Sequence, residues 1–293
     1  MIQMDVNEVF ITCVDKWAKN EFDDRIDDAI DKFDGWICRL DDDERELLAK
    51  LLQKFNYYSK SYTADIIRKL SDESIERCGI SNTDSVISVV RKSNGKRNSS
   101  YAYWDLHSTV SGLSKEIYYD SVENIDEFEW TNIKKVVYVD DCSGTGKQFV
   151  KFMRRQRKSF LNKQVVLIVI EAVEDAKAYI KKELEKDKIN IEIISYSTKE
   201  KALKNMQEKE KNIFFSISQK KQISEGYICG FEDAEALMAF YNNTPNDTLG
   251  LFWLPSEKNN PIFPRKLEEK PGWKLKGEKE KRRRQQYEAK CSQ

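Results

Sequence analysis

The first 80 residues carry apolar side chains at the spacing of amphipathic helices. Apolar residues recur every three or four positions, which places them on one face of a helix. Three stretches show this spacing: Val6, Phe10, Cys13, Val14 and Trp17; Ile26, Ile30, Phe33 and Ile37; and Leu47, Leu48, Leu51, Leu52 and Phe55. Acidic runs at 23–24 and 41–43 are typical of helix starts, where carboxylates meet the positive end of the helix dipole. The pattern predicts an N-terminal helical region over residues 1–80, which we interpret as a cap or partner-binding element.

From residue 85 the pattern changes to short apolar runs that alternate with helical segments. It predicts strands at 85–90, 116–122, 136–139, 165–170 and 189–195, and helices at 101–112, 148–157 and 174–186. A continuous apolar run such as 165–170 is typical of a strand buried on both faces of a parallel sheet. The strand–helix rhythm therefore predicts an α/β fold, a parallel sheet flanked by helices, over residues 81–212.

Beyond residue 212 the chain breaks into shorter pieces. An apolar run at 213–217 and a helical pattern at 231–241 precede a cluster of turn residues at 242–247. Another apolar run at 249–254 is followed by Pro255, Pro261 and Pro264, which favour a loop. We expect a hood-like C-terminal segment over residues 213–265 and a charged tail over residues 266–293.

The composition favours a folded cytoplasmic protein. Forty percent of the 293 residues are hydrophobic, which is enough for a core, and 50 Lys and Arg balance 50 Asp and Glu. No apolar stretch is long enough to span a bilayer, and the N-terminus carries no secretion signal. Six scattered cysteines predict reduced thiols, and a single histidine argues against zinc. That residue, His107, lies in an aromatic stretch, which favours a structural role.

One segment carries most of the candidate chemistry. The strand at 136–139 runs into Asp140, Asp141, Cys142, Ser143, Gly144, Thr145, Gly146, Lys147 and Gln148. A buried strand followed by a loop of small residues and a helix start presents backbone N–H groups to an anion, and glycines let a phosphate approach closely. The adjacent carboxylates can accept hydrogen bonds from hydroxyl groups or bind Mg²⁺. The alternative is an ordinary polar turn between a strand and a helix.

Two common phosphate-binding motifs do not fit this segment. A Walker A loop needs Gly at position 141 and Ser or Thr at position 148, where the chain has Asp141 and Gln148. The dinucleotide-binding pattern needs a third glycine where the chain has Phe149. Another kind of phosphate loop is therefore indicated.

The run from Val136 to Gly146 resembles the ribose-phosphate signature of type I phosphoribosyltransferases: four hydrophobic residues, two acids, three variable residues, Thr-Gly, one variable residue and Thr. The resemblance implies that Asp140 and Asp141 are the catalytic acids, which hold the ribose hydroxyls and a Mg²⁺ ion, directly or through water. It implies that residues 143–148 bind the 5′-phosphate of phosphoribosyl pyrophosphate. Gln148 departs from the final Thr. Gly144 stands where purine-salvage members have an acid that serves the base, so the acceptor side stays undefined.

A basic loop follows the first predicted strand of the sheet. Its residues include Arg91, Lys92, Ser93, Asn94, Gly95, Lys96 and Arg97. It follows the strand at 85–90, two predicted strands before the strand at 136–139. The resembled family places its pyrophosphate-binding loop at this point, and Asn94-Gly95 permits a tight turn. A solvated basic hairpin tip is the alternative, and both interpretations stay open.

A second resemblance concerns the C-terminal part. Segments such as Thr244-Pro245-Asn246 and 261–265 look like those of a bacterial phosphoribosyltransferase-like family found in conflict and antiphage operons, some of whose members accompany retron reverse transcriptases. This resemblance implies a toxin effector of antiviral defence, with a reverse transcriptase and its RNA or DNA product as partners. The basic run at 279–284 could contact nucleic acid or be a solvated tail. A nucleotide sensor or an assembly module without turnover is the alternative function, and an oligomer stays open.

Overall fold

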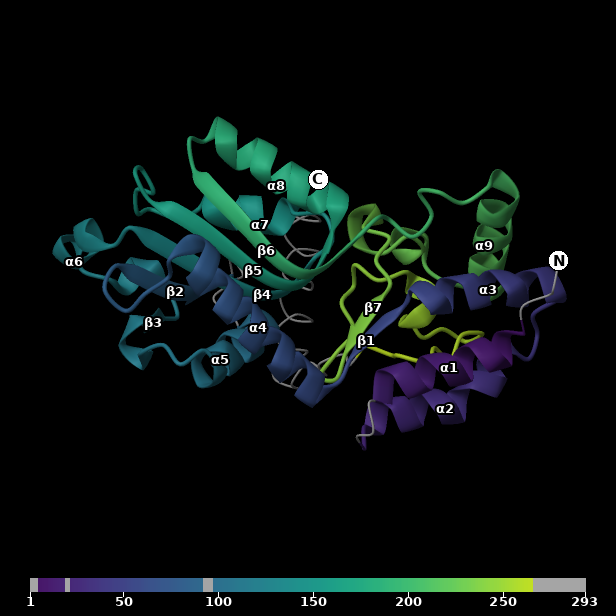
Figure 1. The fold of residues 1–293 in the computed structure, drawn as a ribbon. Coiled ribbons are helices and arrows are strands. Elements are labelled where there is room, and N and C mark those ends of the chain that lie inside the picture. Colours follow the sequence, from purple (N-terminus) through teal and green to yellow (C-terminus); the bar gives the residue numbers. More distant parts are fainter. Residues whose placement is uncertain (1–4, 19–21, 92–96, 266–293) are drawn as a thin grey trace, which may run out of the picture.

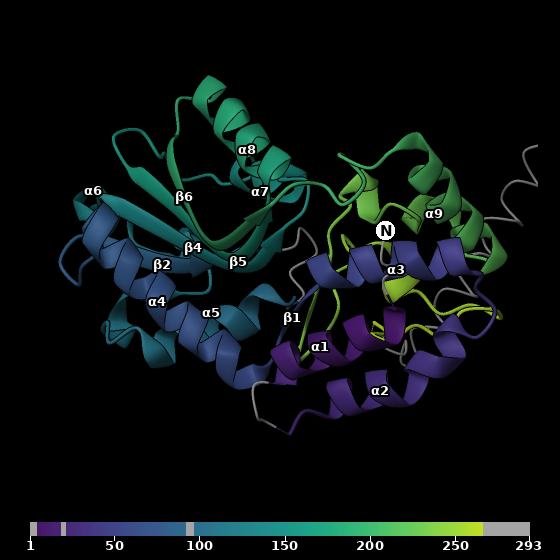
Figure 2. The ribbon, with the colours of Figure 1, turned by 45° about the vertical axis from the view of Figure 1, so that its right-hand side comes forward.

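The computed structural model describes residues 5–18, 22–91 and 97–265. These residues form two bodies that lie side by side, an α/β body around a parallel sheet and a second body rich in helices (Figure 1; Figure 2). The chain begins in the second body, crosses to the α/β body with α4 and returns after β6. The strands and helices of both bodies, in chain order, are as follows.

The elements are α1 (Val6–Ala18), α2 (Asp24–Ile37), α3 (Asp42–Lys54), β1 (Asn56–Tyr58), α4 (Lys60–Cys78), β2 (Ser85–Val89), α5 (Ser100–Val110), β3 (Tyr118–Tyr119), α6 (Glu127–Asn132), β4 (Lys135–Ser143), α7 (Lys147–Met153), β5 (Gln164–Val173), α8 (Glu174–Lys186), β6 (Asn190–Lys199), α9 (Glu208–Lys220) and β7 (Met238–Phe240). Short 3-10 helices are η1 (Lys115–Ile117), η2 (Val122–Asn124), η3 (Glu225–Tyr227), η4 (Phe231–Asp233) and η5 (Gly250–Phe252).

The α/β body is built on one five-stranded sheet among the described residues. Its strand order is β3-β2-β4-β5-β6, and every neighbouring pair is parallel. Helices α4 and α5 pack on one face of the sheet, and α6, α7 and α8 pack on the other. Because both faces are covered, the central strands β4 and β5 are nearly free of exposed residues. The predicted fold class, a parallel sheet flanked by helices, is confirmed.

The second body joins the two ends of the described chain in one core. Helices α1–α3 pack with α9, with η5 and with Phe263. The rings of Trp17, Phe55 and Phe263 lie against one another, with centroids 5.2–5.8 Å apart. Strands β1 and β7 pair in parallel, with Asn56 opposite Met238. Described residues between 6 and 57 and between 202 and 263 thus share one hydrophobic cluster, whereas α4 packs with the sheet.

Helix starts in the second body follow the acidic pattern of the sequence. Asp23 caps α2, and its side chain accepts a hydrogen bond from the N–H of Arg25. Asp41 caps α3 and forms a capping box with Glu44. Each cap satisfies N–H groups that the first helical turn leaves without partners. The predicted role of these acids at helix starts is confirmed.

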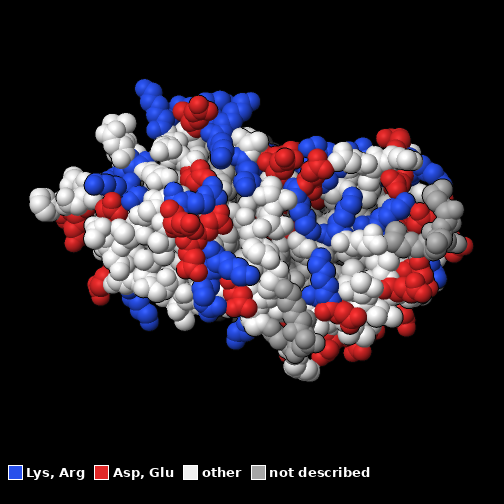
Figure 3. Space-filling view, in the orientation of Figure 1, with Lys and Arg blue, Asp and Glu red and all other residues white. Residues whose placement is uncertain are grey.

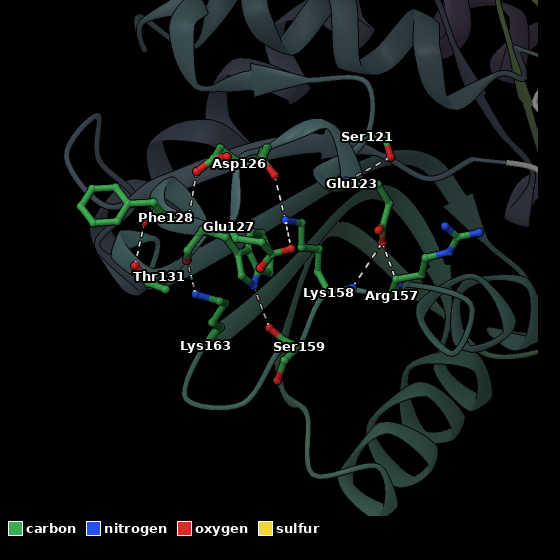
Figure 4. Close-up of polar contacts among 12 residues, drawn as sticks. Ser121, Glu123, Asp126, Glu127, Phe128, Thr131, Arg157, Lys158, Ser159 and Lys163 are labelled. Carbon is green, nitrogen blue, oxygen red and sulfur yellow. Dashed lines mark hydrogen bonds and ion pairs between the residues drawn. The ribbon is translucent and has the colours of Figure 1, made fainter.

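At the end of the α/β body that lies far from the second body, polar contacts join the segment of η2 and α6 to the loop between α7 and β5 (Figure 4). The Glu123 carboxylate accepts hydrogen bonds from the backbone N–H groups of Arg157 and Lys158. The ammonium of Lys158 donates to the Ile125 carbonyl at 2.8 Å, and that of Lys163 donates to the Trp130 carbonyl at 2.7 Å. These bonds fasten α6 to the loop that leads from α7 into β5.

Three sequence predictions need correction. The strand predicted at 116–122 is two residues long, because Ser114 and Ser121 each start a 3-10 helix that takes up the neighbouring residues. The helix predicted at 231–241 is absent: Glu232, Asp233 and Glu235 have positive φ, and β7 pairs with β1. The helix predicted at 148–157 ends at Met153, since the following residues 154–158 offer no apolar side chain to the sheet.

Acidic and basic side chains intermingle over both bodies on the face shown in Figure 3. No helix among the described residues is both long and apolar enough to cross a membrane.

Candidate functional site

The acidic pair lies at the carboxyl end of β4, the central strand of the sheet. Strand β4 extends through Asp140 and Asp141 to Ser143, with β2 on one side and β5 on the other. This end of the strand faces the second body, where the chain continues after β6 (Figure 1). Ligands of parallel α/β sheets bind beyond the carboxyl ends of the strands. The candidate site is therefore the junction between β4 and the second body.

Asp140 is buried, and hydrogen bonds from two elements fix its position. Its Oδ1 accepts from the hydroxyl of Ser100 on α5 at 2.7 Å and from the backbone N–H of Asp141 at 2.9 Å. Burial, together with the adjacent Asp141 carboxylate, raises the pKa of Asp140 well above its usual range. Asp141 is half-buried, and its Oδ1 accepts from the N–H of Cys142 at 2.8 Å. Two adjacent carboxylates of this kind are stabilised by hydroxyl donors or by a bound metal ion.

The loop after the acidic pair packs tightly on the rest of the α/β body. Gly146 has φ +74°, and a Cβ added there would lie 2.7 Å from Cγ1 of Ile180 and 2.8 Å from the carbonyl oxygen of Ala176, both on α8. The hydroxyl of Thr145 accepts from the N–H of Lys147 at 3.4 Å. Lys147 and Gln148 are exposed, and the Lys147 ammonium lies 3.4 Å from the Glu232 carboxylate. Packing against α8 therefore fixes the path of the loop 143–146, and the helix start that follows it faces η4 through Lys147.

A third carboxylate, which the sequence did not indicate, joins this loop. Asp247 is the last residue of the turn cluster at 242–247, and its Oδ2 accepts a hydrogen bond from the N–H of Gly144 at 3.1 Å. Burial and the nearby Asp141 raise the pKa of Asp247 to about 6. The one sequence feature that could have indicated such a contact is Gly144, because a residue without a side chain leaves room for a group from another segment.

The described ends of the basic loop lie beside the acidic pair. Val89 of β2 is opposite Val139 of β4, so the loop leaves the sheet next to Asp140. The side-chain amide of Asn98 donates to the Val90 carbonyl at 2.9 Å, which fixes the far end of the loop. Residues Lys92, Ser93, Asn94 and Gly95 lie outside the described residues, so their predicted contact with pyrophosphate stays a prediction.

The single histidine is embedded in the α/β body. Nδ1 of His107 lies 2.7 Å from the hydroxyl of Tyr118, and burial lowers the pKa of the imidazole to about 4. The ring is therefore neutral at physiological pH. The buried ring on α5 packs against the half-buried Tyr118, as a structural role would require.

A small cavity of about 260 Å³ lies one strand away, at the carboxyl ends of β5 and β6. Its buried Glu171 is opposite Cys142 in the register and accepts hydrogen bonds from Asn56 and Tyr58 of β1, each at 2.6 Å. Burial lowers the pKa of Lys199, which also lines the cavity. Because β1 belongs to the second body, Glu171 holds the two bodies together beside the candidate site.

The described residues fit a metal ion only in part. No group of three or more His, Cys, Asp or Glu side chains among them is arranged to hold a metal. Mg²⁺ commonly takes one or two carboxylates from a protein and the remaining ligands from water and substrate phosphates. The pair Asp140 and Asp141 meets that smaller requirement, so an ion that arrives with a phosphorylated substrate fits better than a resident one.

A parallel sheet covered by helices, with an acidic pair and a glycine-containing loop at the carboxyl end of its central strand, defines the class of parallel α/β proteins, whose ligands bind beyond the carboxyl ends of the strands. Within this class the chain belongs to the PRTase-CE family, whose model matches residues 33–265. PRTase abbreviates phosphoribosyltransferase, and the predicted resemblance to type I phosphoribosyltransferases is confirmed at this level. The matched range includes parts of both bodies.

Two solved structures are similar to about half of the chain. Helicobacter pylori xanthine-guanine-hypoxanthine phosphoribosyltransferase has 13% identity and a TM-score of 0.33, over 48% of this chain and 85% of that chain. A hypothetical protein from Neisseria gonorrhoeae with bound ppGpp has 14% identity and a TM-score of 0.31, over 50% of this chain and 85% of that chain. Sequence identities and TM-scores this low do not assign a reaction or a substrate to this chain. No curated protein matches the sequence.

Proposed function

We propose that the protein binds phosphoribosyl pyrophosphate, or a related ribose phosphate, together with Mg²⁺, and transfers or cleaves the ribose phosphate at its anomeric carbon. The observation that carries the proposal is the acidic pair at the end of β4, followed directly by the loop 143–146, in a chain of the PRTase-CE family. The acids offer acceptors to the ribose diol, and the loop offers N–H donors to the phosphate.

Each residue of the pair has a defined part in this proposal. Asp140 is held through Oδ1 by Ser100 and by the N–H of Asp141, and in the proposal its carboxyl group accepts from a ribose hydroxyl. Asp141 is more exposed and is the better placed of the two to meet a metal-bound water. The Mg²⁺ would neutralise charge on the departing pyrophosphate. The basic loop, from Arg91 to Gly95, would contribute further positive charge to the same leaving group.

Calorimetry with phosphoribosyl pyrophosphate and Mg²⁺ tests the proposal. The double variant Asp140→Asn/Asp141→Asn should lose binding, whereas Asp72→Asn, which removes an exposed charge from α4, should bind like the wild type. Equal and negligible heats from the wild type and the double variant would reject the ribose-phosphate site.

The biological setting that we propose is a cytoplasmic toxin effector of a bacterial antiphage system of the retron type. A reverse transcriptase and its RNA or DNA product would be the partners that restrain it. Phage challenge of cells with the native operon tests this setting. Protection that persists after Asp140→Ala/Asp141→Ala, at unchanged expression, would reject an enzymatic effector.

A nucleotide sensor or assembly module without turnover is the second candidate. Two features favour it: the loop has no side chain at Gly144, and Asp247 occupies the N–H of that residue. Release of pyrophosphate separates the two functions. Binding without release of pyrophosphate, with and without the native partners, would favour the sensor.

A further inference from the structure

The carboxylate of Asp247 lies where a ligand anion would meet the loop 143–146. Its Oδ2 accepts the hydrogen bond of the Gly144 N–H at 3.1 Å. A Cβ added to Gly144 would lie 2.7 Å from Cβ of Asp247, so only glycine at this position lets the carboxylate approach. A Cβ on Gly230 would lie 2.7 Å from the carbonyl carbon of Asp247. Two glycines from different segments therefore make room for this one residue.

The charges around Asp247 oppose a second anion at the same place. After burial, the Asp141 carboxylate raises the pKa of Asp247 most, and Glu232 acts in the same direction. The guanidinium of Arg265 acts in the opposite sense but more weakly than burial does. A phosphate brought to the Gly144 N–H would meet the carboxylate already bonded there, and like charges at such a distance repel strongly.

Arginines of the second body hold the segment that carries Asp247. Arg25 of α2 donates to the Phe240 carbonyl at 3.0 Å, to the Thr244 hydroxyl at 2.8 Å and to the Pro264 carbonyl at 3.1 Å. Arg265 donates to the Thr244 carbonyl at 3.2 Å. The segment 240–247 is therefore bonded to α2 through the buried Arg25. It is also bonded to the α/β body, because the Tyr103 hydroxyl of α5 donates to the side-chain oxygen of Asn242 at 3.1 Å.

We propose that Asp247 competes with an incoming phosphate for the Gly144 N–H and so holds the site closed to phosphate ligands until the segment 240–247 moves. The inference rests on the proposed function, whose regulation it names. The ligand class it concerns is any phosphate monoester or diphosphate that needs the loop 143–146. Since the segment is bonded to Arg25 of α2, a shift of α2 away from the α/β body that also breaks the bond between Tyr103 and Asn242 withdraws Asp247 from the loop.

Calorimetry of three variants with orthophosphate and with ribose 5-phosphate tests the inference. Asp247→Ala removes both the charge and the hydrogen bond, and both ligands should bind about tenfold more tightly than to the wild type. Asp247→Asn keeps an acceptor for the Gly144 N–H and removes the charge, so it should give a smaller gain. Asp233→Asn, on the neighbouring exposed turn, should change neither affinity.

The outcomes separate this inference from the proposed function. A gain in orthophosphate affinity, without ribose 5-phosphate binding by any protein, would support competition at the loop and reject the ribose-phosphate site. Ribose 5-phosphate that binds the wild type and Asp247→Ala equally tightly would overturn the competition and leave the site in place. Weaker binding by Asp247→Ala, or no gain with either ligand, would also overturn it.

A second measurement addresses the contact itself. Gly144→Ala should destabilise the wild type, because its Cβ has no room beside Asp247. The same change in the Asp247→Ala background should cost much less, as urea unfolding of all four proteins would show. Equal costs in the two backgrounds would mean that Asp247 does not lie against Gly144, and the inference would fail.

Discussion

Replacing Gly146 by alanine tests whether the loop of the candidate site is held by α8. Gly146 has φ +74°, a conformation that an L side chain adopts at a cost of about 1–2 kcal/mol. The new Cβ would also lie 2.8 Å from the carbonyl oxygen of Ala176, which is helix backbone and cannot rotate away. Such overpacking costs typically about 1–3 kcal/mol. Gly146→Ala should therefore lower the free energy of unfolding by about 2–5 kcal/mol.

A second glycine provides a matched control. Gly112 has φ +70°, nearly the φ of Gly146, and a Cβ added there would meet no atom within 4 Å. Gly112→Ala should therefore show the backbone cost alone, about 1–2 kcal/mol. The difference between the two variants isolates the packing of the loop against α8.

Urea unfolding monitored by far-UV circular dichroism measures both values, with equal slopes as the check that the unfolding transition is comparable. The same preparations should be titrated with ribose 5-phosphate. Gly146→Ala is expected to lose ligand affinity because the loop must move away from α8, whereas Gly112→Ala should keep it. Equal destabilisation by the two variants would refute the packing argument, and unchanged affinity in Gly146→Ala would refute the role of the loop.

Three further expectations follow from buried carboxylates. Asp140→Asn should abolish binding of ribose phosphates in calorimetry but leave thermal stability unchanged or higher, because the raised pKa shows that the ionised form is costly and the amide still accepts from Ser100. Burial raises the pKa of Asp247 to about 6, so ionising it costs more in the folded than in the unfolded protein. Wild-type stability should therefore fall relative to Asp247→Asn as the pH rises from about 4 to 6, by about 1–2 kcal/mol in urea curves. Tyr58→Phe should cost about 1.5–3 kcal/mol in the same assay, because buried Glu171 loses a donor.

Local sequence patterns predicted those helices and strands whose buried residues are close together in the sequence. Helix α8 has the predicted bounds 174–186, and β5 contains the apolar run 165–170, because each packs through residues that are neighbours in the sequence. Strands β1 and β7 have three residues each, and their pairing joins positions about 180 residues apart. Such short strands owe their conformation to the partner strand, and no periodicity within three residues can show it.

The same distinction applies to the residues of the candidate site: those contiguous in the sequence were predicted, and those from distant segments were not. Asp140, Asp141 and the loop 143–146 were found together because they are contiguous and follow a buried strand. Ser100 and Asp247 complete the hydrogen bonding of that segment but come from α5 and from the second body. Where those segments meet β4 is decided by the packing of whole helices, which a motif of nine residues does not encode.

The short α7 changes the physical account of how the loop would bind a phosphate. A helix over 148–157 would have placed the positive end of a long helix dipole at the loop, but α7 has seven residues and offers less. The N–H groups of the loop itself must then supply most of the attraction. Their direction depends on Gly146 lying against α8, and the availability of one of them depends on Asp247. Affinity for a phosphate should accordingly respond more to Gly146→Ala and Asp247→Ala than to any change in α7 that preserves its apolar face.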